Sequence, residues 1–162
     1  MSNSGKLSPR QVRYGGAMYG EAEIAAVNAV MADPMGLIPG VKVAEFERRV
    51  AEFMGKRHGV MVNSGSSALL VAMRLADLPA GSEVITPALT FSTDVASIYQ
   101  AGYRPVFVDS GLDDYQILVD RIEDVIGPQT RAILIPDLVG GICDWDRVRD
   151  IADRHGLFVI HD

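Results

Sequence analysis

The sequence predicts an α/β protein, a three-layer fold in which a mostly parallel sheet carries helices on both faces. From residue 58 onward, short apolar runs alternate with stretches of helix-forming residues. The apolar runs are rich in Val and Ile at successive positions, so both faces of each strand must be buried, which is typical of parallel strands. The intervening stretches are about 10 to 15 residues long, which suits crossover helices.

The region before residue 58 predicts an arm, a helix, a loop and a second helix. Residues 1–13 are polar, contain Pro9 and lack a period, so we expect a mobile arm. Helical spacing of apolar residues then predicts a helix over 21–32, which ends before Pro34. The stretch PMGLIPG at 34–40 predicts a shaped loop. A second helical stripe follows it, formed by Val43, Phe46, Val50 and Phe53.

Five strands and four helices are expected in the rest of the chain. The expected strands are HGVMVN at 58–63, EVITP at 83–87, RPVFVD at 104–109, RAILIP at 131–136 and LFVIHD at 157–162. The expected helices lie between them, at 66–78, 90–102, 119–127 and 144–156.

Composition and charge exclude several classes of function. The chain has 15 basic and 21 acidic residues, a net charge of −6, which disfavours nucleic acid and membrane surfaces as partners. No apolar run approaches the roughly 20 residues of a membrane span, and the start lacks a signal-peptide core, so we expect a cytoplasmic protein. The three histidines are not at metal-binding spacing, so no metal is expected, and the single cysteine, Cys143, is interpreted as structural.

In an open parallel sheet, ligands bind beyond the carboxyl ends of the strands. The segment Asn63–Ser67 lies there, before a predicted helix, where free N–H groups, the helix dipole and hydroxyls would hold a phosphate. The alternative is an ordinary serine cap of that helix. No dinucleotide-binding or P-loop motif is present to explain the segment otherwise. Asp109 and Asp137 also follow strands.

Two further residues at this edge suit an aromatic, cationic ligand. Phe91 could stack on a flat ring, although a core or capping role is the alternative. Asp162 follows a buried strand, and a carboxylate there would favour a cationic partner such as a protonated ring nitrogen, unless it is an exposed cap of the next element. A phosphate cradle, a stacking ring and a strand-end carboxylate together match the needs of pyridoxal phosphate.

These residues carry a resemblance to a known family. Through NSGSSALL at 63–70, EVITPALTF at 83–91 and the final DWDRVRDIADRHGLFVIHD, the sequence resembles the DegT/StrS-type sugar aminotransferases, which are fold-type-I pyridoxal-phosphate enzymes. The resemblance begins near Tyr14. It implies that residues 14–162 form the N-terminal part of the cofactor-binding large domain, truncated before the segment that carries the Schiff-base residue.

The resemblance also implies roles for individual residues. Gly65, Ser66 and Ser67 would bind the cofactor phosphate, Phe91 would stack on the ring, and Asp162 would pair with the pyridinium nitrogen of pyridoxal or pyridoxamine phosphate. The loop 34–40 aligns with a loop at the sugar-nucleotide entrance of the family.

Two departures from the family pattern affect function. The residue before the ring-pairing Asp is usually Glu in the family and is His161 here. The Schiff-base lysine of the family has no counterpart, because all three lysines, Lys6, Lys42 and Lys56, precede the phosphate segment. As given, the chain is expected to be inactive alone.

Three functions remain open at this point. The first is a transaminase that moves an amino group from an amino acid to a nucleotide-linked keto sugar, in polysaccharide or deoxyaminosugar biosynthesis. The second is the pyridoxamine-phosphate-dependent 3-dehydratase branch acting on a nucleotide-linked 4-keto-6-deoxyhexose, which TPALTFSTDVA at 86–96 resembles. The third is an inactive fragment or binding module. The resemblance further implies a homodimer.

Overall fold

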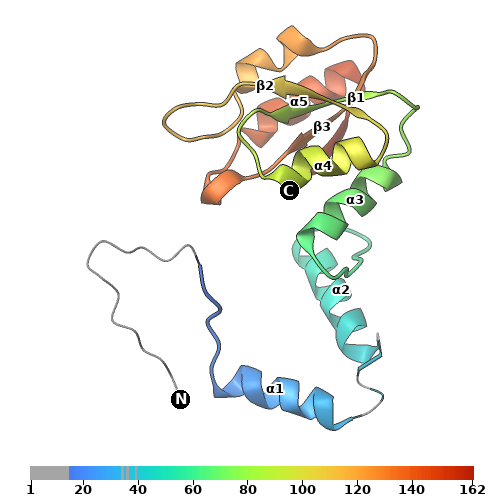
Figure 1. Ribbon diagram of the computed structural model, residues 1–162, viewed down its shortest axis with the longest axis vertical. Helices are drawn as coiled ribbons and strands as arrows, with labels where there is room; N and C mark the ends of the chain where they lie inside the picture. Colours follow the sequence, from blue (N-terminus) through green and yellow to red (C-terminus); the bar gives the residue numbers. More distant parts are fainter. Residues whose placement is uncertain (1–14, 34, 36, 39) are drawn as a thin grey trace. The chain divides into compact units, whose positions relative to one another are not determined.

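The computed structural model describes residues 15–33, 35, 37, 38 and 40–162. The chain divides into two compact units at the junction of Val60 and Met61. Figure 1 labels the helices and strands of both units. The expected arm at 1–13 lies outside the described residues, as do three positions of the loop 34–40.

The first unit contains the two expected helices, α1 (Glu21–Ala32) and α2 (Val41–Phe53). The N–H of Gly20 donates to Glu23 Oε2 at 2.7 Å, which closes the first turn of α1. The segment after α2 returns onto that helix, because a Cβ on Gly59 would lie 2.4 Å from the carbonyl oxygen of Glu47. Only glycine permits this close approach.

The second unit is built on a four-stranded parallel sheet with strand order β2-β1-β3-β4. Its strands are β1 (Glu83–Pro87), β2 (Arg104–Val108), β3 (Thr130–Ile135) and β4 (Phe158–His161). Four of the five expected strands and the parallel α/β class are therefore confirmed. The central strands β1 and β3 are buried along nearly their whole length, which explains their unbroken apolar sequence.

The expected strand at 58–63 is absent. Residues 58–62 have no regular secondary structure, and none of them belongs to the register of the four described strands. An apolar run becomes a strand only where a neighbour supplies the ladder and covers its side chains. Here Val60 is 69% exposed and Met61 50% exposed, so their side chains are not covered in this way.

The expected helix at 119–127 is instead a pair of 3₁₀ turns, Val119–Arg121 and Glu123–Val125. Within this segment the N–H of Ile122 donates to the carbonyl of Val119, three residues earlier. The apolar residues Val119, Ile122 and Val125 recur at intervals of three, which places them on one side of a 3₁₀ helix. The prediction treated this spacing as part of a longer α-helical period.

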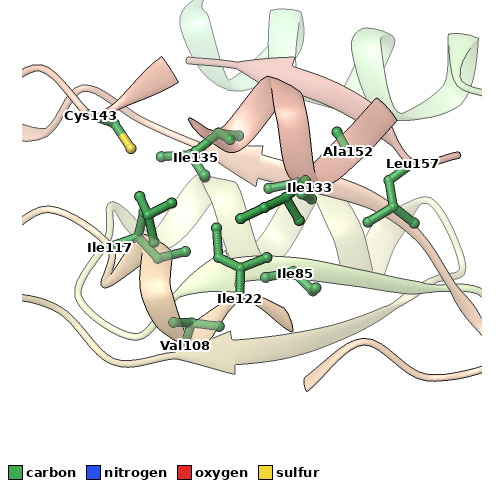
Figure 2. Packing of buried hydrophobic residues seen from close by; sticks show 12 residues of the cluster. Ile85, Val108, Ile117, Ile122, Ile133, Ile135, Cys143, Ala152 and Leu157 are labelled. Atoms are coloured by element: carbon green, nitrogen blue, oxygen red, sulfur yellow. The ribbon is translucent and has the colours of Figure 1, made fainter. Parts of the chain in front are cut away.

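Helices cover both faces of the sheet, as expected for a three-layer fold (Figure 1). On one face, α3 (Gly65–Leu75) and α4 (Ser92–Gln100) pack Met73 and Ile98 against Val84 and Leu134. On the other face lie α5 (Trp145–His155) and the 3₁₀ turns. Figure 2 shows this second cluster, which includes Ile85, Val108, Ile117, Ile122, Ile133, Ile135, Cys143, Ala152 and Leu157.

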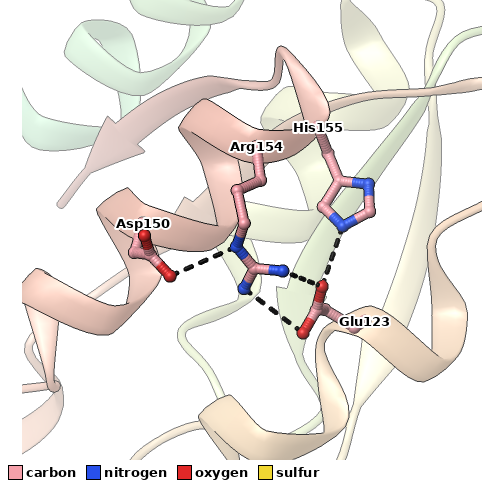
Figure 3. Close-up of polar contacts among 4 residues, drawn as sticks. All are labelled: Glu123, Asp150, Arg154 and His155. Carbon is pink, nitrogen blue, oxygen red and sulfur yellow. Dashed lines mark hydrogen bonds and ion pairs between the residues drawn. The ribbon is translucent and has the colours of Figure 1, made fainter.

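A surface ion network fastens α5 to the second 3₁₀ turn (Figure 3). Arg154 contacts Glu123 at 2.6 Å and Asp150 at 3.2 Å, and His155 Nε2 lies 2.9 Å from Glu123 Oε1. The hydrogen bonds from Arg154 and His155 hold the pKa of Glu123 below its usual range. These contacts fix the helix that packs beneath β3 and β4.

Candidate functional site

Helices α3 and α4 run in the same direction, and this brings their N-termini to one end of the sheet. Arg74 Nη2, in the last turn of α3, donates to the carbonyl of Gln100 at the end of α4 at 2.8 Å. The C-termini of the two packed helices therefore lie together. Because α4 begins directly after β1, both N-termini lie at the carboxyl ends of the strands.

The first turn of α3 has a side-chain N-cap, and two of its residues are exposed to solvent. Ser64 is the N-cap, and its Oγ accepts from the N–H of Ser67 at 3.1 Å and donates to the Ser67 hydroxyl. Gly65 and Ser66 are exposed, and a Cβ on Gly65 would meet nothing within 4 Å. This space, the helix dipole and the Ser66 hydroxyl make the turn suited to an anion.

Phe91 stands at the N-cap position of α4. Its carbonyl oxygen accepts from the N–H of Asp94 at 3.0 Å, while its side chain is 57% exposed. The backbone of Phe91 thus caps the helix, whereas its ring is not packed in the core. An exposed ring in this position is available to cover a flat ligand.

Asp162 extends β4 by one residue beyond the strand. Its N–H donates to the carbonyl of Ile135 and its own carbonyl accepts from the N–H of Asp137, both at 3.0 Å. The backbone of Asp162 is therefore fixed, whereas its side chain is exposed at the same sheet edge as the N-termini of α3 and α4. The structure thus places Gly65, Ser66, Ser67, Phe91 and Asp162 at one edge of the second unit.

The sequence analysis missed Asp94, a carboxyl group at this edge. It lies in the first turn of α4, fully buried, and its Oδ2 accepts from the Thr90 hydroxyl. Burial raises the pKa of Asp94, and the neighbouring charge of Asp162 raises it further. One signal in the sequence could have identified Asp94: it stands at helical spacing from Ile98 and Ala101, and the three residues share the buried face of α4.

His161 points to the opposite face of the sheet from Asp162, because successive residues of a strand alternate between faces. Its Nε2 lies 2.7 Å from Asp137 Oδ2, and its ring lies 3.9 Å from that of Trp145, centroid to centroid. Asp137 Oδ1 also accepts from the N–H of Cys143 and from Trp145 Nε1, both at 3.0 Å. His161 therefore belongs to a polar cluster on the α5 side.

The same cluster explains Cys143. Its side chain is buried, and burial together with the charge of Asp137 raises its pKa to about 11. A thiol with this pKa is almost entirely protonated near neutral pH and is a poor nucleophile. The structure thus favours the structural role that the sequence indicated.

The second unit contains no lysine and, within the described residues, no cluster of metal ligands. In the described ranges, no group of three or more His, Cys, Asp or Glu side chains could hold a metal ion. Lys42 and Lys56 belong to the first unit, where Lys42 pairs with Glu45, and Lys6 lies outside the described residues. Among the helices that the structure describes, none is long and apolar enough to cross a membrane.

Comparison with known proteins gives consistent relatives. The chain is 36% identical over 147 residues to a spore coat polysaccharide biosynthesis protein of Bacillus subtilis, covering 90% of this chain and 37% of that protein. A Helicobacter pylori aminotransferase involved in the biosynthesis of pseudoaminic acid superimposes with a TM-score of 0.86 at 28% identity, over 93% of this chain and 40% of that one.

A solved structure of a second activity matches almost as well. The Escherichia coli GDP-4-keto-6-deoxy-D-mannose-3-dehydratase, with bound hydrated pyridoxal phosphate, gives a TM-score of 0.83 at 27% identity, over 91% of this chain and 39% of that one. The chain thus spans well under half the length of the proteins it matches. The family model of the DegT/DnrJ/EryC1/StrS aminotransferases matches residues 18–162. With its parallel sheet and its relatives in agreement, the chain belongs to the DegT/DnrJ/EryC1/StrS aminotransferase family.

Proposed function

We propose that this chain forms the phosphate-, ring- and nitrogen-binding part of a pyridoxal-phosphate-dependent enzyme that aminates a nucleotide-linked keto sugar. One observation carries the proposal: an open helix N-terminus, an exposed ring and a strand-end carboxylate meet at one edge of the sheet. The relatives support it, since they include an aminotransferase and an enzyme with bound pyridoxal phosphate.

The described residues fit each part of the cofactor. The phosphate dianion suits the amides of Gly65 and Ser66 with the Ser66 and Ser67 hydroxyls, where the space over Gly65 leaves room for it. The Phe91 ring, exposed at the start of α4, suits one face of the pyridine ring. Asp162 would accept a hydrogen bond from the protonated pyridine nitrogen.

The cofactor, when bound, supplies an electron sink for the substrate carbon. The contribution of this chain would be to bind and orient it. Asp162 would hold a proton at the pyridine nitrogen, because a nearby carboxylate favours the cationic form of that nitrogen. Its fixed backbone keeps the carboxylate in place during the reaction.

The remaining features of the complete enzyme are also proposals. We propose that residues 14–162 are the N-terminal part of the cofactor domain, and that the catalytic lysine of the family comes from a later segment. The position of all three lysines before the phosphate segment supports this. We further propose an amino-acid donor, a homodimer and a cytoplasmic location, which accord with the family.

The second candidate is the 3-dehydratase branch. The similarity to the Escherichia coli dehydratase favours it, because its TM-score and identity nearly equal those of the aminotransferase. The two activities would use the same phosphate turn, ring and carboxylate. The residue at the catalytic-lysine position of the complete gene separates them: a lysine there excludes the dehydratase, and a histidine excludes the transaminase.

The proposal is tested by equilibrium dialysis of the purified chain against pyridoxal phosphate and pyridoxamine phosphate. Asp162→Asn should weaken binding of both compounds. Asp109→Asn is the matched control, since Asp109 is also an exposed carboxylate directly after a strand and its Oδ1 accepts a local N–H, that of Ser110. Equal binding by the two variants would contradict the role of Asp162.

A second measurement concerns the missing lysine. With pyridoxal phosphate, the chain should show no absorption band that borohydride fixes covalently. A fixed band that disappears on substitution of Lys42 or Lys56 would overturn the assignment of the catalytic lysine to a later segment.

A further inference from the structure

The buried carboxyl group of Asp94 has no cationic partner among the described residues. Its Oδ2 accepts from the Thr90 hydroxyl, whereas its Oδ1 is buried and has no hydrogen-bond partner in the described part of the chain. An ionised carboxylate in this state would lose its hydration without compensation. A neutral acid, in contrast, has an O–H on Oδ1 that must find an acceptor.

The charged groups on the elements packed against α4 do not compensate Asp94. Arg74 of α3 binds the carbonyl of Gln100 at the far end of α4. Glu83 of β1 and Arg104 of β2 pair with each other at the amino ends of their strands, 3.0 Å apart. The charge that does reach Asp94 is the carboxylate of Asp162. Asp162 also interacts with Asp94 through its side chain, and its backbone is fixed at the same sheet edge. Two interacting carboxyl groups favour a state in which they hold one proton between them.

We propose that Asp94 is a neutral carboxylic acid whose Oδ1–H donates to the carboxylate of Asp162, so that the two side chains share a single negative charge. Asp94 is then a positioning residue. It holds one oxygen of Asp162 and leaves the other free to face a ligand, while Thr90 holds Asp94 from behind. The identity of the ligand as a protonated pyridine nitrogen rests on the proposed function, whereas the sharing of one proton by Asp94 and Asp162 does not.

The state of Asp94 is measured first without cofactor, by ¹³C NMR titration of aspartate-labelled chain. The Asp94 carboxyl should stay in the acid form well above the ordinary aspartate value of 3.8. In Asp162→Asn its titration should move to lower pH, because the neighbouring charge is removed. An Asp94 that titrates at the ordinary value, or that is unaffected by Asp162→Asn, overturns the proposal.

Two substitutions then separate donation from packing. Asp94→Asn keeps an N–H donor toward Asp162 and an acceptor for Thr90, so affinity for pyridoxal phosphate should stay within about twofold of the original. Asp94→Leu has similar size and no donor, so affinity should fall about tenfold, the usual scale for one charge-assisted hydrogen bond. Equal affinity of the two variants overturns the positioning role.

Failure of the proposed function gives a different result. In that case neither the original chain nor any variant binds pyridoxal phosphate, while the Asp94 titration and its response to Asp162→Asn stay as described. If Asp94→Leu does not fold, the titration and the Asp94→Asn affinity still decide, because a tenfold loss in Asp94→Asn would contradict the donor role.

Discussion

His161 Nε2 lies 2.7 Å from Asp137 Oδ2, and this contact joins the carboxyl ends of β4 and β3. The backbone continues the link, since the N–H of Asp137 donates to the carbonyl of Asp162 beyond the ends of the strands. His161 and Asp137, on the α5 face, thus hold the end of β4 in place. The next residue, Asp162, points to the opposite face of the sheet. His161 thus lies on the α5 face, on the other side of the sheet from the Asp162 side chain.

Asp137→Asn should destabilise the chain by about 1–3 kcal/mol near neutral pH, since one carboxylate oxygen accepts from Cys143 and Trp145 and the other from His161. Although burial opposes ionisation, these hydrogen bonds lower the pKa of Asp137 below 3.8. Its stabilising contribution is therefore present above pH 3.8 and lost as the pH falls through the lowered value.

Urea denaturation of the two proteins at neutral and acidic pH checks this prediction. The difference between them should shrink toward zero in acid. Asp153→Asn, at a side chain that is 68% exposed and pairs with Arg149 at 3.7 Å, is the control and should stay close to the original stability. A difference that is independent of pH would mean that ionisation of Asp137 does not matter.

Cys143 should react slowly with a disulfide reagent in the folded chain. Its thiol is buried and has a pKa of about 11, so very little thiolate is present at neutral pH. The rate of thionitrobenzoate release from Ellman's reagent should rise sharply when urea unfolds the chain. Fast reaction of the folded chain would indicate an activated cysteine.

The sequence predicted the strands that are buried on both faces. It did not predict the segments whose secondary structure depends on their tertiary contacts. EVITP and RAILIP can be recognised as central strands because their apolar residues occupy both faces, which is typical of a covered parallel sheet. Apart from Glu83 and Arg131, their residues are buried. HGVMVN has the same apolar character, but Val60 and Met61 are largely exposed and the segment forms no strand. The segment 119–127 has the length of a helix, yet its three-residue spacing forms 3₁₀ turns.

The candidate site divides in the same way. Phe91 and Asp162 follow strands that the structure contains, so sheet topology predicts that they share an edge. Ser66 is expected there because it follows the apolar run at 58–63, which forms no strand, and it reaches this edge because α3 packs alongside α4. Helical spacing places Asp94 on the buried face of α4, but its interaction with Asp162 depends on how α4 packs and cannot be predicted from the local sequence. The contact of His161 with Asp137 likewise requires side chains from two strands to point to one face.

Phe91→Leu should weaken binding of pyridoxal phosphate by about two- to tenfold, which is the affinity equivalent of losing one aromatic stacking contact. Stability should hardly change, because the ring is 57% exposed and the helix uses only the backbone of Phe91. Equilibrium dialysis and thermal unfolding measure the two effects. Phe158→Leu, at the amino end of β4 and 48% exposed, is the control and should leave binding unchanged.

Ser64 and Ser66 should have opposite effects when each is replaced by alanine. Ser64→Ala removes the N-cap of α3 and should cost about 0.5–2 kcal/mol of stability. Ser66→Ala should leave stability unchanged, since its side chain is exposed, and should weaken binding of pyridoxal phosphate. Urea denaturation and equilibrium dialysis on the same preparations check both expectations.

The pair distinguishes a phosphate site from an ordinary helix start, which the sequence leaves open. Ser67 cannot decide alone, because its N–H and hydroxyl both engage Ser64, so its loss would affect the cap as well as the ligand. Replacing Ser66 and Ser67 together should therefore weaken binding more than Ser66→Ala does, with some loss of stability. If affinity is the same in Ser66→Ala, in the double variant and in the original chain, then the turn is only a helix cap and the phosphate must bind elsewhere.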